Sequence, residues 1–115
     1  CAAGPPLGRT QLLSAKLTTR SVVERVEVAR VDLAPGQGGG LHLHPCPVVG
    51  YVIAGAVRYQ VEGEGEQTLA AGQAFYEPAH QRILHFDNAS RAEPASFAAF
   101  YLVGPGQDQL IEMID

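Results

Sequence analysis

The sequence predicts an all-β fold, a small antiparallel barrel or jelly roll within a single domain. The chain has 115 residues, enough for one hydrophobic core and too few for two ordinary domains. Its apolar residues recur with the two-residue period of strands, and no segment has a clean helical period. Thirteen glycines and eight prolines, without a low-complexity run, divide the chain into short segments. A barrel of this size has room for one small ligand.

The N-terminal quarter of the chain contains an arm and two predicted strands. Residues 1–9 are rich in Gly and Pro and are expected to form the arm, with the barrel spanning 10–115. A first strand is predicted over residues 10–17. Charged and apolar residues alternate imperfectly over 22–33, which predicts a long, half-buried strand that stops before Pro35.

The rest of the chain is a series of short apolar segments separated by turn residues. Val57, Tyr59 and Val61 alternate with polar neighbours, so one face of that strand is predicted to be buried. The residues at 63–66 are typical of a hairpin tip. The tail is the single place where one helical turn is expected, over residues 108–114. The further predicted strands are 41–44, 48–53, 57–61, 68–70, 74–77, 83–86 and 97–103.

Composition excludes some classes of partner. The formal charge of −4 and the lack of a Lys/Arg cluster argue against nucleic-acid binding. The longest apolar run, Pro45 to Ala56, is too short to span a bilayer. Nothing in the sequence suggests a disulfide between Cys1 and Cys46, and both a cytoplasmic and an exported location remain open. Because small barrels have exposed edges, a homodimer is expected.

Two histidines one residue apart follow a glycine-rich turn, and this pattern resembles the first motif of the cupins. That motif is a glycine, five residues, His-x-His, three or four residues, a glutamate, six residues and a glycine. The matching positions are Gly36, His42, His44 and Gly55. Val48 occupies the position of the glutamate. The resemblance covers residues 26–103 and implies a cupin-type barrel, or jelly roll.

The second cupin motif is matched only in part. It consists of a glycine, five residues, Pro-x-Gly, two residues, a histidine, three residues and an asparagine. Gly72 and Pro78 match, and Asn88 lies one position beyond its place. His80 replaces the second glycine, and Ile83 replaces the histidine. Of the four positions that bind metal in cupins, two are therefore kept and two are aliphatic.

The kept histidines predict a metal site that needs at least one more ligand. His42 and His44 point to the same face because side chains alternate along a strand. Catalytic metal sites usually have three protein ligands and one open position. His85 is the predicted third ligand, although it lies about 6.6 Å along the strand from Ile83, so that a bulge would have to bring it back. The expected ion is Fe, Mn, Ni or Zn.

Several other side chains are candidates for the pocket. His80 is a second candidate for the missing ligand, although a turn residue is more often solvated. Glu77 can serve as a carboxylate ligand or a base, whereas a strand-end glutamate is more often exposed. Tyr51 and Tyr59 are more typical of core packing than of substrate stacking. The full set of pocket candidates is Val48, Tyr51, Tyr59, Glu77, His80 and Ile83.

Two functions remain open from the sequence. In the first, His42, His44 and His85 bind a divalent transition metal, and a small organic molecule meets it in the barrel. A neutral three-histidine site would favour dioxygen chemistry on a chelating substrate. In the second, Val48 and Ile83 line an apolar cavity that binds a small molecule without metal.

Overall fold

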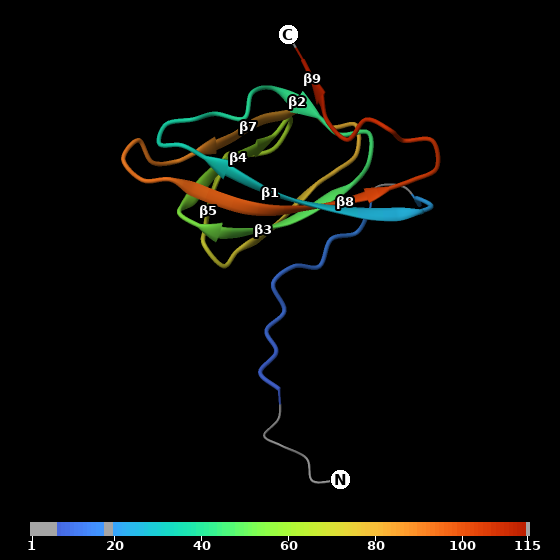
Figure 1. The fold of residues 1–115 in the computed structure, drawn as a ribbon, viewed down its shortest axis with the longest axis horizontal. Helices are drawn as coiled ribbons and strands as arrows, with labels where there is room; N and C mark the ends of the chain where they lie inside the picture. The colour runs from blue at the N-terminus through green and yellow to red at the C-terminus, as the bar shows by residue number, and fades with distance from the viewer. Residues whose placement is uncertain (1–6, 18–19, 115) are drawn as a thin grey trace.

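The structure is a computed structural model that describes residues 7–17 and 20–114. In this part of the chain the regular elements are strands, and they form two antiparallel sheets that face each other (Figure 1). The first sheet has the order β1-β8-β3-β6 and the second β5-β4-β7-β2-β9. The strands of the first sheet are β1 (Arg25–Leu33), β3 (Val48–Ala54), β6 (Ala74–Glu77) and β8 (Ala95–Val103). Those of the second are β2 (His42–Leu43), β4 (Ala56–Val61), β5 (Gln67–Ala70), β7 (Ile83–Asn88) and β9 (Glu112–Met113).

This architecture confirms the predicted all-β jelly roll, and the buried face of β4 is the predicted one. Val57, Tyr59 and Val61 are at most 5% exposed. They join a core in which four aromatic rings pack with centroids 4.5–6.0 Å apart. Leu33, Phe86 and Phe97 belong to this core and also line the cavity, so the cavity adjoins the core.

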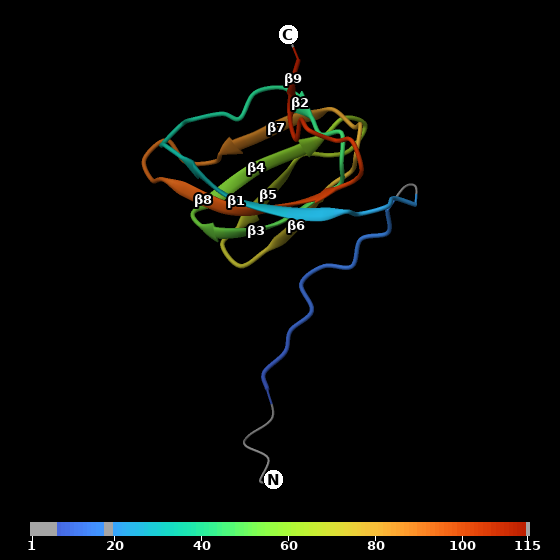
Figure 2. The ribbon, with the colours of Figure 1, turned by 45° about the vertical axis from the view of Figure 1, so that its right-hand side comes forward.

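Two segments differ from their predicted structure. Residues 10–17 form no strand, and the described part of this segment extends beyond the sheets in both views (Figures 1 and 2). The first strand starts at Arg25 because Val22 and Val23 have no pairing partner in β8. The tail forms the short strand β9 in place of a helical turn, and β9 pairs with β2. Residues 1–6 of the predicted arm lie outside the described residues. Within the described ranges, the structure contains no helix of the length and apolar character needed to cross a bilayer.

Two motif residues close the ends of the strands. Gly55 adopts φ 75°, and a Cβ there would lie 2.6 Å from the carbonyl oxygen of Pro94, so only glycine fits the β3–β4 turn. Asn88 donates its side-chain amide to the carbonyl oxygens of Leu33, Ala34 and Glu93. This amide joins the end of β1 to the turn between β7 and β8.

A bulge in β7 decides which of its side chains face the core. Gln60 pairs with His85, but the next residue of β4, Val61, pairs with Ile83, so Leu84 is the extra residue. After the bulge, Phe86 is buried and His85 lies on the outer side of the sheet. The extra residue also explains why Asn88 lies one position beyond its place in the motif.

Candidate metal centre

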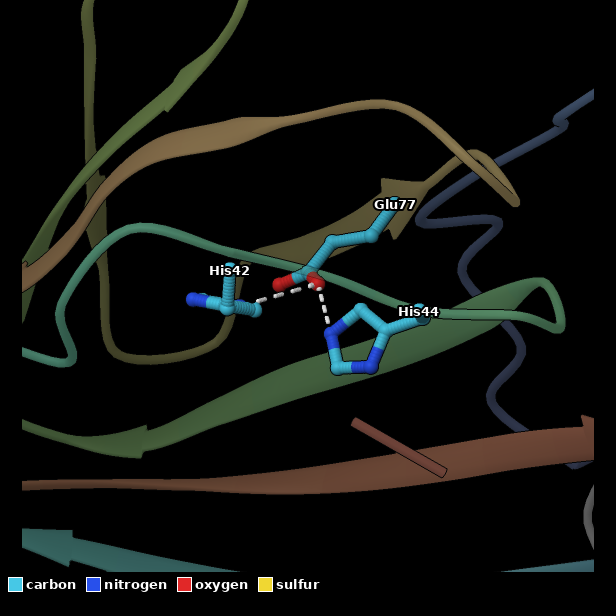
Figure 3. A group of neighbouring side chains, drawn as sticks. All are labelled: His42, His44 and Glu77. Atoms are coloured by element: carbon cyan, nitrogen blue, oxygen red, sulfur yellow. Dashed lines mark ion pairs between the residues drawn. The ribbon is translucent and has the colours of Figure 1, made fainter. Parts of the chain in front are cut away.

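Three buried side chains converge at one end of the space between the sheets: His42, His44 and Glu77 (Figure 3). His42 and His44 come from β2 and the residue that follows it, and Glu77 is the last residue of β6. None of the three is more than 5% exposed. One ligand atom from each residue lies within 4.8 Å of the other two, which makes this group able to hold a metal ion.

Each imidazole is oriented by a backbone carbonyl. Nδ1 of His42 donates to the carbonyl oxygen of Gly40 at 2.8 Å, and Nδ1 of His44 donates to that of Leu110 at 2.7 Å. Since a carbonyl oxygen can only accept, each Nδ1 carries the hydrogen. In the neutral ring, Nε2 then carries a free lone pair. This arrangement, in which Nδ1 is held by a hydrogen bond and Nε2 is free to coordinate, is typical of metal-binding histidines.

Both Nε2 atoms face the carboxylate of Glu77. Oε2 of Glu77 lies 2.5 Å from Nε2 of His44 and 3.8 Å from Nε2 of His42. This oxygen is buried and has no hydrogen bond of acceptable geometry. Two neutral lone pairs against a buried carboxylate repel one another, so the group requires a positive charge between them, either a proton or a metal ion. Two atoms that bind one ion at about 2.1 Å lie roughly 3.0–3.4 Å from each other, so small shifts of the side chains would bring both pairs of atoms to this separation.

The pKa values of the metal-free group have opposite shifts. Burial tends to lower the pKa of His42, but the proximity of Glu77 and the Gly40 carbonyl raise it above its ordinary value of 6.5. Burial tends to raise the pKa of Glu77, but His42 and His44 hold it below 4.5. In the metal-free protein, the raised pKa of His42 thus favours a proton on the group, and the lowered pKa of Glu77 favours its ionised form.

A cavity of about 140 Å³ opens beside the three side chains. Its walls are mainly apolar, and the aromatic ring of Tyr101 packs edge-on against His44 with centroids 5.6 Å apart. Burial and the nearby Glu77 raise the pKa of Tyr101, so its hydroxyl stays protonated. The lining includes Val31, Leu33, Val48, Phe86, Phe97 and Ala99.

The structure brings together some of the residues selected from the sequence. His42, His44, Val48 and Glu77 all line the cavity. Glu77, for which exposure was the more common expectation, is 3% exposed. Its burial is explained by its place at the end of β6, where Phe75 and Glu77 share the inner face.

His85 lies outside this group. Its Nδ1 is 2.9 Å from Oδ2 of Asp87, and its Nε2 is 3.3 Å from Nη2 of Arg58. Arg58 in turn makes two hydrogen bonds to Glu66. The bulge at Leu84 turns His85 away from the cavity. The bulge expected from the sequence would have turned His85 toward the metal instead. The carboxylate of Glu77 stands in the place for which a third histidine was expected.

Four other candidates lie apart from the cavity lining. Ile83 is fully buried and pairs with His42 across β2 and β7. The hydroxyl of Tyr59, whose pKa burial raises, donates to the carbonyl oxygen of Tyr76 at 2.5 Å within the core. Tyr51 is 40% exposed on the outer face of the first sheet. His80 is exposed in a turn at φ 62°.

A jelly roll with a buried histidine–carboxylate group beside a small cavity has the features of a barrel that can bind a metal ion and a small molecule. The family model described as "Cupin domain" matches residues 29–102, and the chain belongs to the cupin family. No curated protein matches the sequence at a significant level.

Solved structures with the same fold include enzymes. An oxalate oxidase in complex with the substrate analogue glycolate is 24% identical to this chain, with a TM-score of 0.66. The match covers 77% of this chain and 46% of the oxalate oxidase chain. A DMSP lyase from Ruegeria pomeroyi is 16% identical with a TM-score of 0.62, covering 76% and 42%. A cupin-like protein from Thermotoga maritima is 20% identical with a TM-score of 0.65, covering 77% and 64%. This chain thus spans less than half the length of the first two chains, and these similarities show the fold alone.

Proposed function

We propose that this cupin binds a divalent transition metal through His42, His44 and Glu77 and acts on a small organic molecule held beside the ion. The observation that carries the proposal is the buried Oε2 of Glu77, which lacks a hydrogen bond and faces two imidazole nitrogens. A proton satisfies this arrangement only in part, because it neutralises one of two lone pairs. A divalent ion accepts electron pairs from all three groups.

The ligand set favours iron(II) among the expected ions Fe, Mn, Ni and Zn. Two histidines and one carboxylate with open positions are typical of non-haem iron enzymes that use dioxygen. Bound there, such an ion supplies Lewis acidity and redox chemistry to a coordinated substrate. The chain's own residues orient the imidazoles through Gly40 and Leu110 and exclude water with the apolar walls.

A metal-free function is the second candidate, and the cavity supports it. Val48 replaces a metal ligand of the family with an aliphatic side chain, and it lines the cavity. In this alternative, the ion pair of His42 with Glu77 is a permanent part of the wall, and a small apolar molecule binds over it.

The two candidates differ in metal content. The test is elemental analysis of protein purified without chelator or metal-affinity tag, alongside a His42→Ala/His44→Ala double variant. About one equivalent of transition metal, lost in the double variant, is the expected result. Protein that stays metal-free after incubation with Fe, Mn, Ni and Zn salts would support the second candidate and contradict the first.

We also propose a homodimer formed through the outer face of the first sheet. Val28, Phe100 and Val49 are register neighbours across β1, β8 and β3, so their side chains form one continuous apolar row. Contiguous apolar surface of this kind is typical of an interface. The exposed apolar residues of this face are Val26, Val28, Tyr51, Ile53 and Phe100.

A further inference from the structure

The size of the cavity limits the molecule that can bind in it. Its volume is about 140 Å³. An engineered apolar cavity of about 150 Å³ in another protein holds one benzene molecule. A ligand of about six to eight non-hydrogen atoms therefore fits this cavity, and a larger molecule would have to extend through its mouth.

The charge of the lining limits the ligand further. All eight Lys and Arg residues lie in the described parts of the chain, and none of them lines the cavity. A divalent ion with the single negative charge of Glu77 leaves one positive charge. A ligand with one negative charge neutralises it. A ligand with two leaves a surplus negative charge against Phe86, Phe97 and Ala99, where no Lys or Arg side chain of the described lining compensates it.

One neutral polar group, the hydroxyl of Tyr101, belongs to the cavity lining beside the metal group. Val48 pairs with Glu77 on one side and with Tyr101 on the other, so these three side chains form a row on the inner face of β6, β3 and β8. Neighbouring strands are about 4.8 Å apart, so the Cα atoms of Tyr101 and Glu77 are about 10 Å apart across the sheet. Apart from the three candidate ligands, Tyr101 has the single polar side chain among the described residues of the lining. A ligand held over Val48 can reach both ends of the row.

Building on the proposed metal site, we propose that this site selects small molecules with an apolar body and a single negative charge and rejects dianions of similar size. The negative group meets the ion beside Glu77, the apolar body lies over Val48, and the hydroxyl of Tyr101 is available to a neutral oxygen of the ligand. Val48 is thus a specificity-determining residue, because its aliphatic side chain contacts the apolar body of the ligand.

The test uses protein loaded with Co²⁺, whose visible absorption changes when a ligand coordinates. Butyrate and succinate are the probes, because both present one carboxylate to the ion and differ in a methyl group or a second carboxylate at the far end. We expect butyrate to bind at least tenfold more tightly than succinate. Equal affinities, tighter binding of succinate, or no spectral change with either probe would overturn the proposal.

Two variants separate the charge effect from a general change in the protein. Val31→Lys places a cation at a half-buried position of the cavity wall, and we expect it to reduce the preference for butyrate to less than threefold. Gln60→Lys adds the same charge to the second sheet, outside the cavity, and should keep the tenfold preference. A Val31→Lys preference equal to the wild-type value would contradict the charge argument. Failure of the protein to take up Co²⁺ would instead contradict the proposed metal site.

Discussion

Glu77 lies directly opposite Val48 in the β3–β6 ladder. Val48 occupies the position at which the cupin motif has its glutamate, so the carboxylate missing from β3 is supplied by the neighbouring strand. Both residues are buried and both line the cavity. The histidines kept from the motif therefore face a carboxylate from a different direction, and the group has two histidines and one carboxylate.

The C-terminal tail is expected to control metal affinity. The carbonyl of Leu110 orients His44, Ile111 lines the cavity, and Met113 pairs with His42 in the ladder. Deletion of residues 110–115 removes this orientation, and loss of such an outer partner typically costs about 10–100-fold in metal affinity. Competition with a chelator measures the dissociation constant. The matched control deletes residues 114–115 alone and should change affinity little. Equal affinity of the two truncated proteins would show that the tail does not position His44.

Metal binding is expected to weaken as the pH falls. The ion must replace the proton on His42, whose pKa lies above 6.5, so the loss of affinity should begin above pH 6.5. Titrations with Zn²⁺ between about pH 8 and about pH 6 measure this dependence. A loss of affinity that begins only below pH 6.5 would contradict the raised pKa of His42.

The stability of the metal-free protein should depend on pH in the opposite sense. His42, with a raised pKa in the folded state, contributes stability that is full below 6.5 and is lost as the pH rises through the folded value. Glu77, with a lowered pKa, contributes stability that is full above 4.5 and is lost as the pH falls through its folded value. The group should therefore stabilise the metal-free fold most between pH 4.5 and 6.5. Urea unfolding of the wild type and of Glu77→Gln across this range isolates the contribution.

The outer face of the first sheet is expected to hold the dimer together. Phe100→Glu places a charge in the middle of the apolar row and should convert a dimer to a monomer, measured by light scattering on a sizing column. Gln60→Glu adds the same charge on the second sheet and should remain dimeric. A wild-type protein with the mass of one chain would contradict the proposed interface.

Local patterns were sufficient to predict most strands. The alternation over 57–61 and the turn residues around it gave the buried face of β4 correctly, because both depend on neighbours in sequence. Residues 10–17 have enough apolar character for a strand, but a strand needs a partner, and this segment pairs with none of the described strands. The tail became β9 for the same reason, since β2 offered it an unpaired edge.

The third member of the site could not be predicted from motif positions alone. Phe75 and Tyr76 are both aromatic, so the alternation of β6 does not reveal whether Glu77 faces the core or solvent. That choice depends on the pairing of Val48 with Glu77, a contact between residues far apart in sequence. His85 illustrates the same limit: the extra residue at Leu84 was foreseeable from the position of Asn88, but not the face to which it turns His85.

The most direct test of the account is the metal stoichiometry of two single variants, Glu77→Gln and His85→Ala, loaded with Fe²⁺ under anaerobic conditions and analysed after gel filtration. If His42, His44 and Glu77 form the site, the wild type and His85→Ala retain about one iron per chain. Glu77→Gln keeps the shape of the side chain but not its charge and should lose most of the iron. Iron retained by Glu77→Gln and lost by His85→Ala would contradict the assignment of the carboxylate as the third ligand.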